Sequence, residues 1–344
     1  MGTLKRIEGL QAAFEGAGAE VEQILLRSEH PARARDVLGT SLPALVRGDL
    51  VPETLSWSVS GTLGHLHRIA PDIVLCCTSR AFHPKLTQGP WHTVLDFIDR
   101  LSVSYRDRST VRGVGLLERG AFRCLAGPNT RFERRSRGLH VTRIAAGWTD
   151  ARELQATWVP VTIPVPDSVS PPEPHTDLLF FGNLKYPPNV EAVRRLSDLW
   201  PAVLSRRPGA TIVVAGRNPL PLVRAAAEQR GWTLEEDFDQ LGPLIRSVRL
   251  AVVPLWHASG IQIKVLEAAA HGLPQILSPA ARAGLDPDFP SVTASDDSEL
   301  LDQIDMLLDD PTRRQALGAA SREHVSHLYT SESWVGWART LLQS

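Results

Sequence analysis

The chain has 344 residues, of which 43% are hydrophobic, and its formal net charge is -1 at pH 7. This length exceeds one typical core, and the composition is that of a globular protein, so we expect two domains. No apolar run approaches the roughly 20 residues that cross a bilayer, and the start lacks the charged-then-apolar pattern of an export signal. We therefore expect a cytoplasmic protein.

The spacing of the cysteines and histidines indicates neither disulfide bonds nor a metal site. Cys76 and Cys77 are adjacent and Cys124 stands alone, which matches neither a disulfide framework nor a zinc spacing. We expect buried thiols. His65 and His67 alternate without further ligands nearby, so the sequence predicts no metal site and no cofactor.

In chain order, a helix is predicted from Leu4 to Phe14, followed by Gly16 and Gly18. Candidate strands then alternate with helical stretches at residues 21–26, 73–77, 92–99 and 140–144. This pattern predicts an α/β domain over residues 1–163. A domain of this kind usually opens with a buried strand, whereas this chain opens with a helix.

The segment from Arg100 to Arg143 is strongly basic. It contains eleven arginines against Asp107, Glu118 and Glu133, a local balance of +8, which leaves -9 for the rest of the chain. Two interpretations stay open: a solvated face, or a surface that meets an anionic membrane, where each basic residue contributes about 1 kcal/mol. Nucleic acid is not expected as a partner, because aromatic residues are not interleaved in a stacking pattern.

Prolines mark the boundary between the two halves. Residues 164–176 contain Pro164, Pro166, Pro171, Pro172 and Pro174. Such a segment forms no regular helix and behaves as a semi-stiff connector. We expect it to link the first domain to a second one over residues 177–328.

The second half alternates strands and helices. Buried strands are predicted at residues 178–181, 211–215 and 250–255, and a helix begins near Val190. This alternation predicts a parallel, doubly wound sheet, in which ligands bind beyond the carboxyl ends of the strands. Gly182, Arg217 and Gly260 all fall at such ends.

Residues 250–272 are the most informative stretch. A buried strand leads through Ser259 and Gly260 into a helix with glycine at its C-terminal end. Backbone N–H groups at such a helix start can approach an anion. Lys264 and Glu267 are three residues apart on one helix face, where an ammonium suits a phosphate and a carboxylate suits sugar hydroxyls. The alternative is an ordinary surface pair that supports the helix.

Other catalytic motifs are absent from the sequence. No glycine-rich loop ends in Gly-Lys-Ser or Gly-Lys-Thr, and Gly16-Ala17-Gly18 lacks the third glycine and preceding strand of a dinucleotide site. No nucleophile elbow is present either. Phosphoryl transfer, redox chemistry and triad hydrolysis are therefore disfavoured.

Several short motifs resemble the donor site of retaining glycosyltransferases with the GT-B fold, of the group 1 or family 4 type and its bacterial polysaccharide-associated branch. The motifs are Pro254-Leu255, residues 260–262, residues 264–268 and Gly272-Leu273-Pro274. The resemblance runs from Leu178 to about Leu328 and fades towards the N-terminus. It implies an α/β protein with two Rossmann-like domains facing across a cleft, the first lacking its first strand, and a C-terminal helix in residues 329–344 that packs back on the first domain.

The resemblance also implies roles for particular residues. Lys264 and Glu267 would act in catalysis, and Asp99 would orient the acceptor hydroxyl; a helix N-cap is the alternative for Asp99. Asp96 and Glu118 are weaker candidates. Donor-binding residues would be Gly182, Asn183, Lys185, Arg217, Asn218, Phe238, Ser259, Gly260, Ile261 and Gln262. The chain departs from the family at Ser259, where Glu is frequent, at Asn183, where Arg is common, and at Asp237, where glycine is expected.

The implied activity is transfer of a sugar from a nucleoside-diphosphate sugar to an acceptor hydroxyl, metal-independent and with retention, in polysaccharide or glycolipid assembly. The partners would be this donor and a carbohydrate or lipid-linked acceptor, with peripheral contact at the inner face of the membrane through the basic segment. Two alternatives stay open. One is an impaired nucleotide-sugar-binding partner subunit, since the first strand is missing unless translation starts upstream. The other is a different GT-B enzyme, such as a nucleotide-sugar epimerase.

Overall fold

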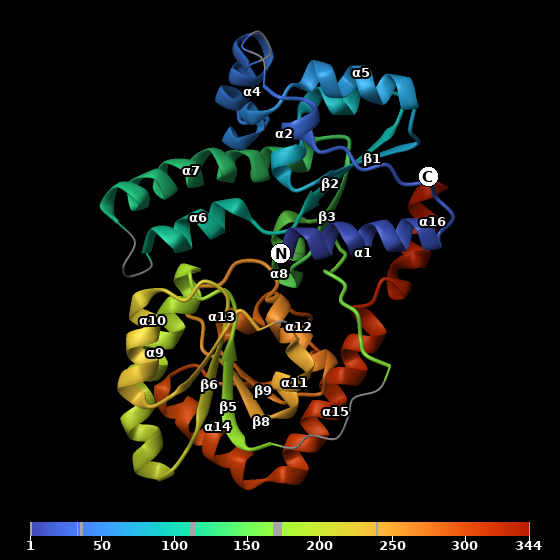
Figure 1. The fold of residues 1–344 in the computed structure, drawn as a ribbon. Helices are drawn as coiled ribbons and strands as arrows, with labels where there is room; N and C mark the ends of the chain where they lie inside the picture. Colours follow the sequence, from blue (N-terminus) through green and yellow to red (C-terminus); the bar gives the residue numbers. More distant parts are fainter. Residues whose placement is uncertain are drawn as a thin grey trace.

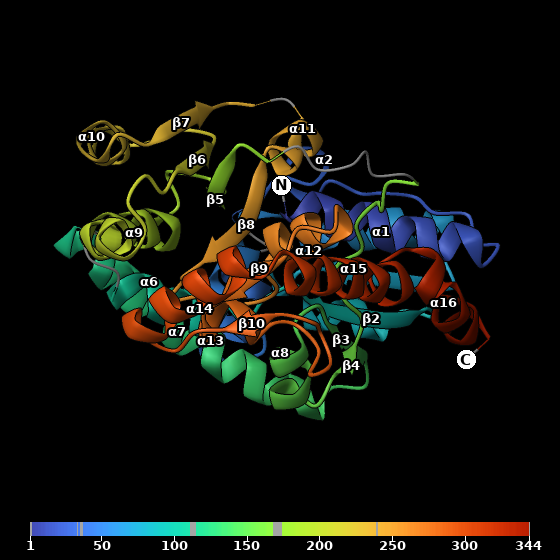
Figure 2. The same ribbon diagram turned by 90° about the horizontal axis from the view of Figure 1, so that it is seen from below.

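The computed structural model describes residues 2–32, 34, 37–110, 115–167, 174–238 and 240–343. Each half of the chain builds its own parallel sheet with helices packed around it, and the two halves lie one above the other (Figure 1). The red helix α15 (Pro311–Leu328) leads from the C-terminal half back towards α16 (Val335–Leu342), which lies beside the N-terminal half (Figures 1 and 2).

The N-terminal half contains a four-stranded parallel sheet in the order β1-β2-β3-β4. Its strands are β1 (Ile73–Cys77), β2 (His92–Phe97), β3 (Thr142–Ala145) and β4 (Thr157–Trp158). Its helices are α1 (Gly2–Gly16), α2 (Leu26–Glu29), α4 (Leu42–Arg47), α5 (Val59–Ile69), α6 (Leu101–Thr110), α7 (Leu116–Arg135) and α8 (Trp148–Leu154), with short turns η1 (Val37–Ser41), η2 (Pro52–Ser56), η3 (Ser79–Ala81), η4 (Pro84–Gln88) and η5 (Ser136–Gly138). The central strand β2 is buried from Thr93 to Phe97, as expected for a strand covered on both faces.

Two sequence predictions for this half are wrong. Residues 21–25 form no strand: they cross the surface between α1 and α2, where Ile24 packs on the core but Leu25 is 63% exposed. A short segment with several apolar residues can pack in this way without a neighbouring strand to bond with. Cys124 is exposed on α7 rather than buried, whereas Cys76 lies in the core and Cys77 is partly buried.

The C-terminal half contains a six-stranded parallel sheet in the order β10-β9-β8-β5-β6-β7. Its strands are β5 (Thr176–Phe181), β6 (Ile212–Gly216), β7 (Thr233–Glu236), β8 (Val248–Val253), β9 (Gln275–Leu277) and β10 (Val292–Thr293). Its helices are α9 (Pro187–Arg206), α10 (Pro221–Arg230), α11 (Leu241–Arg246), α12 (Ile263–Ala270), α13 (Pro279–Arg282), α14 (Asp297–Asp309) and α15 (Pro311–Leu328). The strand order reverses between β5 and β8, and the crevice beyond their carboxyl ends is where sheets of this type bind ligands.

Helix α1 lies on the N-terminal sheet and is tied to it by a buried arginine. Arg6 is 1% exposed, and its Nε and Nη2 donate to the two carboxylate oxygens of Asp96 at 3.1 and 2.8 Å. Its Nη1 donates to the backbone oxygens of Val159 and, at 2.6 Å, Pro160. A buried guanidinium is tolerated because its donors are paired in this way.

The C-terminal helix packs beside α1, in the same hydrophobic clusters as residues of β1. The short turn η6 (Glu332–Trp334) leads into α16 (Val335–Leu342), which packs against α1 with the Phe14 and Trp337 rings 5.7 Å apart (Figure 1). Trp158 joins the halves, because its ring lies 5.7 Å from that of Trp334 and 5.9 Å from that of Tyr329. Within the described ranges, the helices all fall short of the length and apolarity needed to cross a bilayer.

Candidate functional site

Two loops meet at the point where the strand order of the C-terminal sheet reverses. One follows β5 and begins at Gly182, and the other follows β8 and leads into α12. Gly182 has φ +154°, which favours glycine, and a β-carbon there would lie 2.9 Å from Asn189 Nδ2 and 3.3 Å from Lys264 Nζ. Both loops therefore converge on the Lys264 ammonium.

Lys264 points from α12 into the first loop. Its Nζ donates to Asn189 Oδ1 at 2.5 Å and lies 4.8 Å from the centre of the Phe180 ring. Asn189 Nδ2 in turn donates to the backbone oxygen of Asn183 at 2.9 Å. Burial lowers the pKa of Lys264 to about 7, although the nearby Glu267 carboxylate opposes the shift. An anion bound here would favour the charged form of this lysine.

Glu267 faces the N-terminal domain. Its Oε1 forms an ion pair with Nζ of Lys5, on α1, and the two side chains are 21% and 24% exposed. The Glu267 carboxylate also favours the charged form of Lys264, so the two residues interact along the helix as well. Both residues of the predicted pair lie on the side of the sheet that meets the other domain.

The turn before α12 is pressed against the N-terminal domain. Gly260 has φ +65°, and a β-carbon there would lie 3.0 Å from Cβ of Asp99 and 3.3 Å from the backbone oxygen of Ile98. On the other side, the backbone oxygen of Gly260 approaches Gly284 so closely that a β-carbon at 284 would lie 2.3 Å from it. The turn therefore sits at the junction of the domains, next to the end of β2.

Asp99 lies beside this turn and just before α6, and its carboxyl group is hydrogen-bonded to Ser104 of that helix. Glu133 of α7 binds the start of α6 as well, because its Oε1 accepts from the backbone N–H of Ser102 at 2.9 Å and its Oε2 accepts from the Ser102 hydroxyl at 2.6 Å. Burial raises the pKa of Asp99, and Arg80 and Arg108 oppose this shift. A carboxyl group with a raised pKa at a domain junction is suited to proton transfer.

Of the two weaker acidic candidates, neither faces this junction as a free group. Asp96 is fully buried and held by Arg6, and Glu118 is exposed near the start of α7. Asp96 has a structural role, because removing it would leave a buried guanidinium unpaired.

The remaining predicted donor residues surround the two loops. Lys185 and Arg217, the two candidates for diphosphate contact, are exposed, and the backbone oxygen of Arg217 accepts from the N–H of Leu184 at 2.9 Å. Asn218 is exposed with φ +54°, whereas Phe238 is partly buried. Ser259, Ile261 and Gln262 are partly buried in the turn, where Gln262 Nε2 donates to the backbone oxygen of Ser259 at 3.4 Å.

Sequence reasoning missed two residues that the structure brings to this place. Asn189 lies in the first turn of α9, and no local signal distinguished it from other polar residues. Lys5 is separated from Glu267 by 262 positions in the chain, and nothing in its own sequence surroundings points to that contact.

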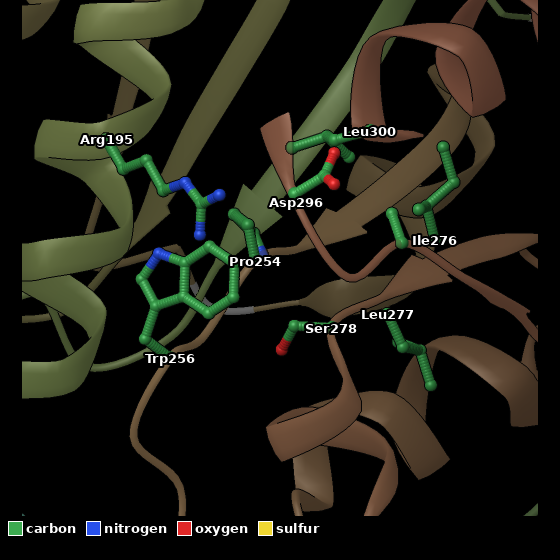
Figure 3. A pocket seen from close by; sticks show the side chains of 9 residues that line it. Arg195, Pro254, Trp256, Ile276, Leu277, Ser278, Asp296 and Leu300 are labelled. Carbon is green, nitrogen blue, oxygen red and sulfur yellow. The ribbon is translucent and has the colours of Figure 1, made fainter. Parts of the chain in front are cut away.

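A small hollow lies close by, on the α9 side of the sheet (Figure 3). Arg195 stacks on Trp256 there, with its guanidinium carbon 3.3 Å from the ring centre, and Pro254, Ser278 and Asp296 complete the surroundings. Its volume of about 10 Å³ is room for about one water molecule, so it is too small for a nucleotide or a sugar.

Comparison with known proteins agrees with this geometry. The family model described as "Glycosyl transferases group 1" matches residues 175–310, which include both loops and α12. Residues 175–310 are therefore similar in sequence to group 1 glycosyltransferases. The chain as a whole has the GT-B fold, in which two such α/β domains stand opposite each other.

Three solved structures illustrate the likeness in fold. TarM, from S. aureus, is 10% identical with a TM-score of 0.62, and the match covers 84% of this chain and 59% of TarM. Sucrose-phosphate synthase from Thermosynechococcus elongatus is 13% identical with a TM-score of 0.61, covering 83% of this chain and 75% of that one. HepE from Anabaena, in complex with UDP, is 13% identical with a TM-score of 0.57, covering 83% and 80%. No curated protein sequence matches the chain.

Proposed function

We propose that this protein transfers a sugar from a nucleoside-diphosphate sugar to an acceptor hydroxyl, with retention of the anomeric configuration. The observation that carries the proposal is the position of Lys264 and Glu267. Both lie at the reversal point of the C-terminal sheet, on the side that meets the N-terminal domain. A cation and a carboxylate so placed match a diphosphate and its ribose.

Each group has a defined task in this reaction. Lys264 and the backbone N–H groups of the Gly260 turn stabilise the departing diphosphate, because charge develops there in the transition state. Glu267 accepts hydrogen bonds from the ribose hydroxyls, and Phe238 borders the base. Asp99, next to Gly260, orients the acceptor hydroxyl. We propose no protein nucleophile and no metal: the leaving phosphate takes the acceptor proton on the same face.

The printed ligands of the similar structures support a nucleotide-sugar donor. HepE structures contain UDP and UDP-glucose, and a TarM structure contains UDP together with alpha-GlcNAc-glycerol. We propose that this protein likewise uses a nucleoside-diphosphate sugar with a carbohydrate or lipid-linked acceptor, in cytoplasmic assembly of a polysaccharide or glycolipid.

We further propose peripheral contact with the inner face of the membrane through the basic segment. Leu116 and Leu117, at the start of α7, are 85% and 93% exposed. Several arginines of the segment instead bond within the protein, as Arg135 does with Asp49 at 2.9 Å. Co-sedimentation with phosphatidylserine vesicles tests the contact: binding that Leu116→Ser with Leu117→Ser removes supports it, and no binding contradicts it.

Thermal unfolding with nucleotides tests the donor site. We expect UDP or GDP to raise the melting temperature, since a ligand at 100 times its Kd adds about 2.7 kcal/mol of stability. Lys264→Ala and Glu267→Ala should abolish the rise. Glu323→Ala, an exposed change on α15, is the matched control and should retain it. No shift with any nucleoside diphosphate would contradict the assignment.

Product analysis separates transfer from the alternatives. Incubation with UDP- and GDP-sugars in the presence of candidate saccharide acceptors should yield a glycoside of unchanged anomeric configuration by NMR. An epimerised donor would instead indicate an epimerase. Nucleotide binding without any product would indicate a partner subunit.

A further inference from the structure

Lys5 is held in a fixed position at the edge of the candidate donor site. The next residue, Arg6, is bound to Asp96 and to two backbone oxygens inside the N-terminal domain. Helix α1 therefore cannot slide without breaking a buried ion pair. From this anchored helix, Lys5 reaches across the domain junction to Glu267 Oε1.

We infer that Lys5 is a donor-binding residue, which supplies from the N-terminal domain the positive charge that the diphosphate of the donor requires. This inference rests on the proposed function. Lys5 balances the Glu267 carboxylate, so that an anion can bind beside it, and it offers an ammonium to the nearer phosphate.

The hydrogen-bonding capacity of the two groups permits this arrangement. A lysine ammonium has three donors, and among the residues that the structure describes Lys5 uses one of them, to Glu267 Oε1. A carboxylate has two oxygens, so Glu267 can keep Lys5 on Oε1 while Oε2 accepts from a ribose hydroxyl. Lys5 thus need not compete with the nucleotide for Glu267.

The basic residues of the C-terminal domain supply little positive charge at this place, which Lys5 would supplement. The loop after β5 carries Asn183 rather than a basic residue at its second position, and Lys185 and Arg217 are exposed. Lys264 gives one of its three hydrogen-bond donors to Asn189. Without Lys5, an incoming diphosphate would meet a Glu267 carboxylate whose charge is balanced by Lys264 alone, and the carboxylate and the phosphates repel each other.

A charge series of ligands tests the inference. We expect calorimetric titration to give Lys5→Met at least tenfold weaker binding of UDP than the wild type, because a hydrogen bond to a charged group contributes about 1.5–3 kcal/mol. The loss should be smaller for UMP and less than about twofold for uridine, as expected for an electrostatic contribution that grows with ligand charge. GDP, GMP and guanosine replace this series if the wild type binds GDP rather than UDP.

The chain offers matched controls, because Lys5, Lys85, Lys185 and Lys264 are its only lysines. Lys85→Met, within η4 of the N-terminal domain, should bind UDP as the wild type does. Lys5→Arg should recover most of the affinity, since it restores the positive charge.

Three results would overturn the inference while leaving the proposed function intact: equal losses for UDP and uridine, unchanged binding of both, or tighter binding of UDP. Equal losses would mean a purely structural contact, and tighter binding would mean that Lys5 blocks the site. Failure of the wild type to bind either UDP or GDP would refute the proposed function and the inference together.

Discussion

Two neighbouring residues of α1 make ion pairs of very different kinds. Arg6 pairs with Asp96 inside the N-terminal domain, and both side chains are at most 1% exposed. Lys5 pairs with Glu267 of the other domain, and both side chains are between a fifth and a quarter exposed. A buried pair is costly to break because each charge depends on the other, whereas an exposed pair contributes little to stability and can exchange its partner. The first contact is suited to structure and the second to binding.

The largest expected effect comes from breaking the buried pair. Arg6→Met should lower the free energy of unfolding by about 3–5 kcal/mol, because Asp96 would remain as an uncompensated buried charge. Urea unfolding followed by circular dichroism measures this loss. Arg68→Met, an exposed change at the end of α5, should alter stability by less than about 0.5 kcal/mol. Similar losses for the two variants would contradict the distinction between buried and exposed groups.

A smaller effect is expected at the backbone of the domain junction. Gly260→Ala places a β-carbon at φ +65° and 3.0 Å from Cβ of Asp99, so we expect a loss of about 1–2 kcal/mol of stability and weaker UDP binding. Gly64→Ala in α5 has open space around it and should instead stabilise the protein by about 0.5–1 kcal/mol. Thermal unfolding with and without UDP measures both variants, and a Gly260→Ala protein that binds UDP normally would place the donor elsewhere.

A pH dependence distinguishes Lys264 from fully solvated lysines. The pKa of Lys264 is lowered from 10.5 to about 7, so between these values the folded protein holds fewer protons at this group than the unfolded chain. Its contribution to stability is therefore unfavourable below pH 7 and improves as the pH rises towards 10.5.

Nucleotide binding should show the opposite dependence, because UDP favours the charged form of Lys264. Above pH 7, we expect the affinity for UDP to fall by up to about tenfold per pH unit. Titration calorimetry from pH 6.5 to 9 measures the slope. Lys264→Met should bind weakly with little slope in this range, and a flat profile in the wild type would show that the ammonium does not meet the phosphates.

Much of the C-terminal domain could be predicted from local sequence. The runs at residues 178–181, 211–215 and 250–255 gave strands close to β5, β6 and β8, because strands buried on both faces are continuously apolar. The sequence singled out Gly182 and Gly260 as positions where the backbone could come close to a ligand. It also singled out Lys264 and Glu267 as side chains suited to a phosphate and to sugar hydroxyls. In the N-terminal half, the strand predicted at residues 21–26 is absent, because a short apolar segment does not reveal whether a neighbouring strand exists.

The sequence by itself determined the alternation of strands and helices in the second half, the turn at Gly260 and the choice of Lys264 and Glu267 as candidates. These features depend on periodicity and on residues close together in the chain. Only the tertiary structure decided which partners these side chains have: Asn189 for Lys264, Lys5 for Glu267 and Asp96 for Arg6. Such partners are set by how helices and domains pack, and packing brings together residues whose separation along the chain leaves no local pattern.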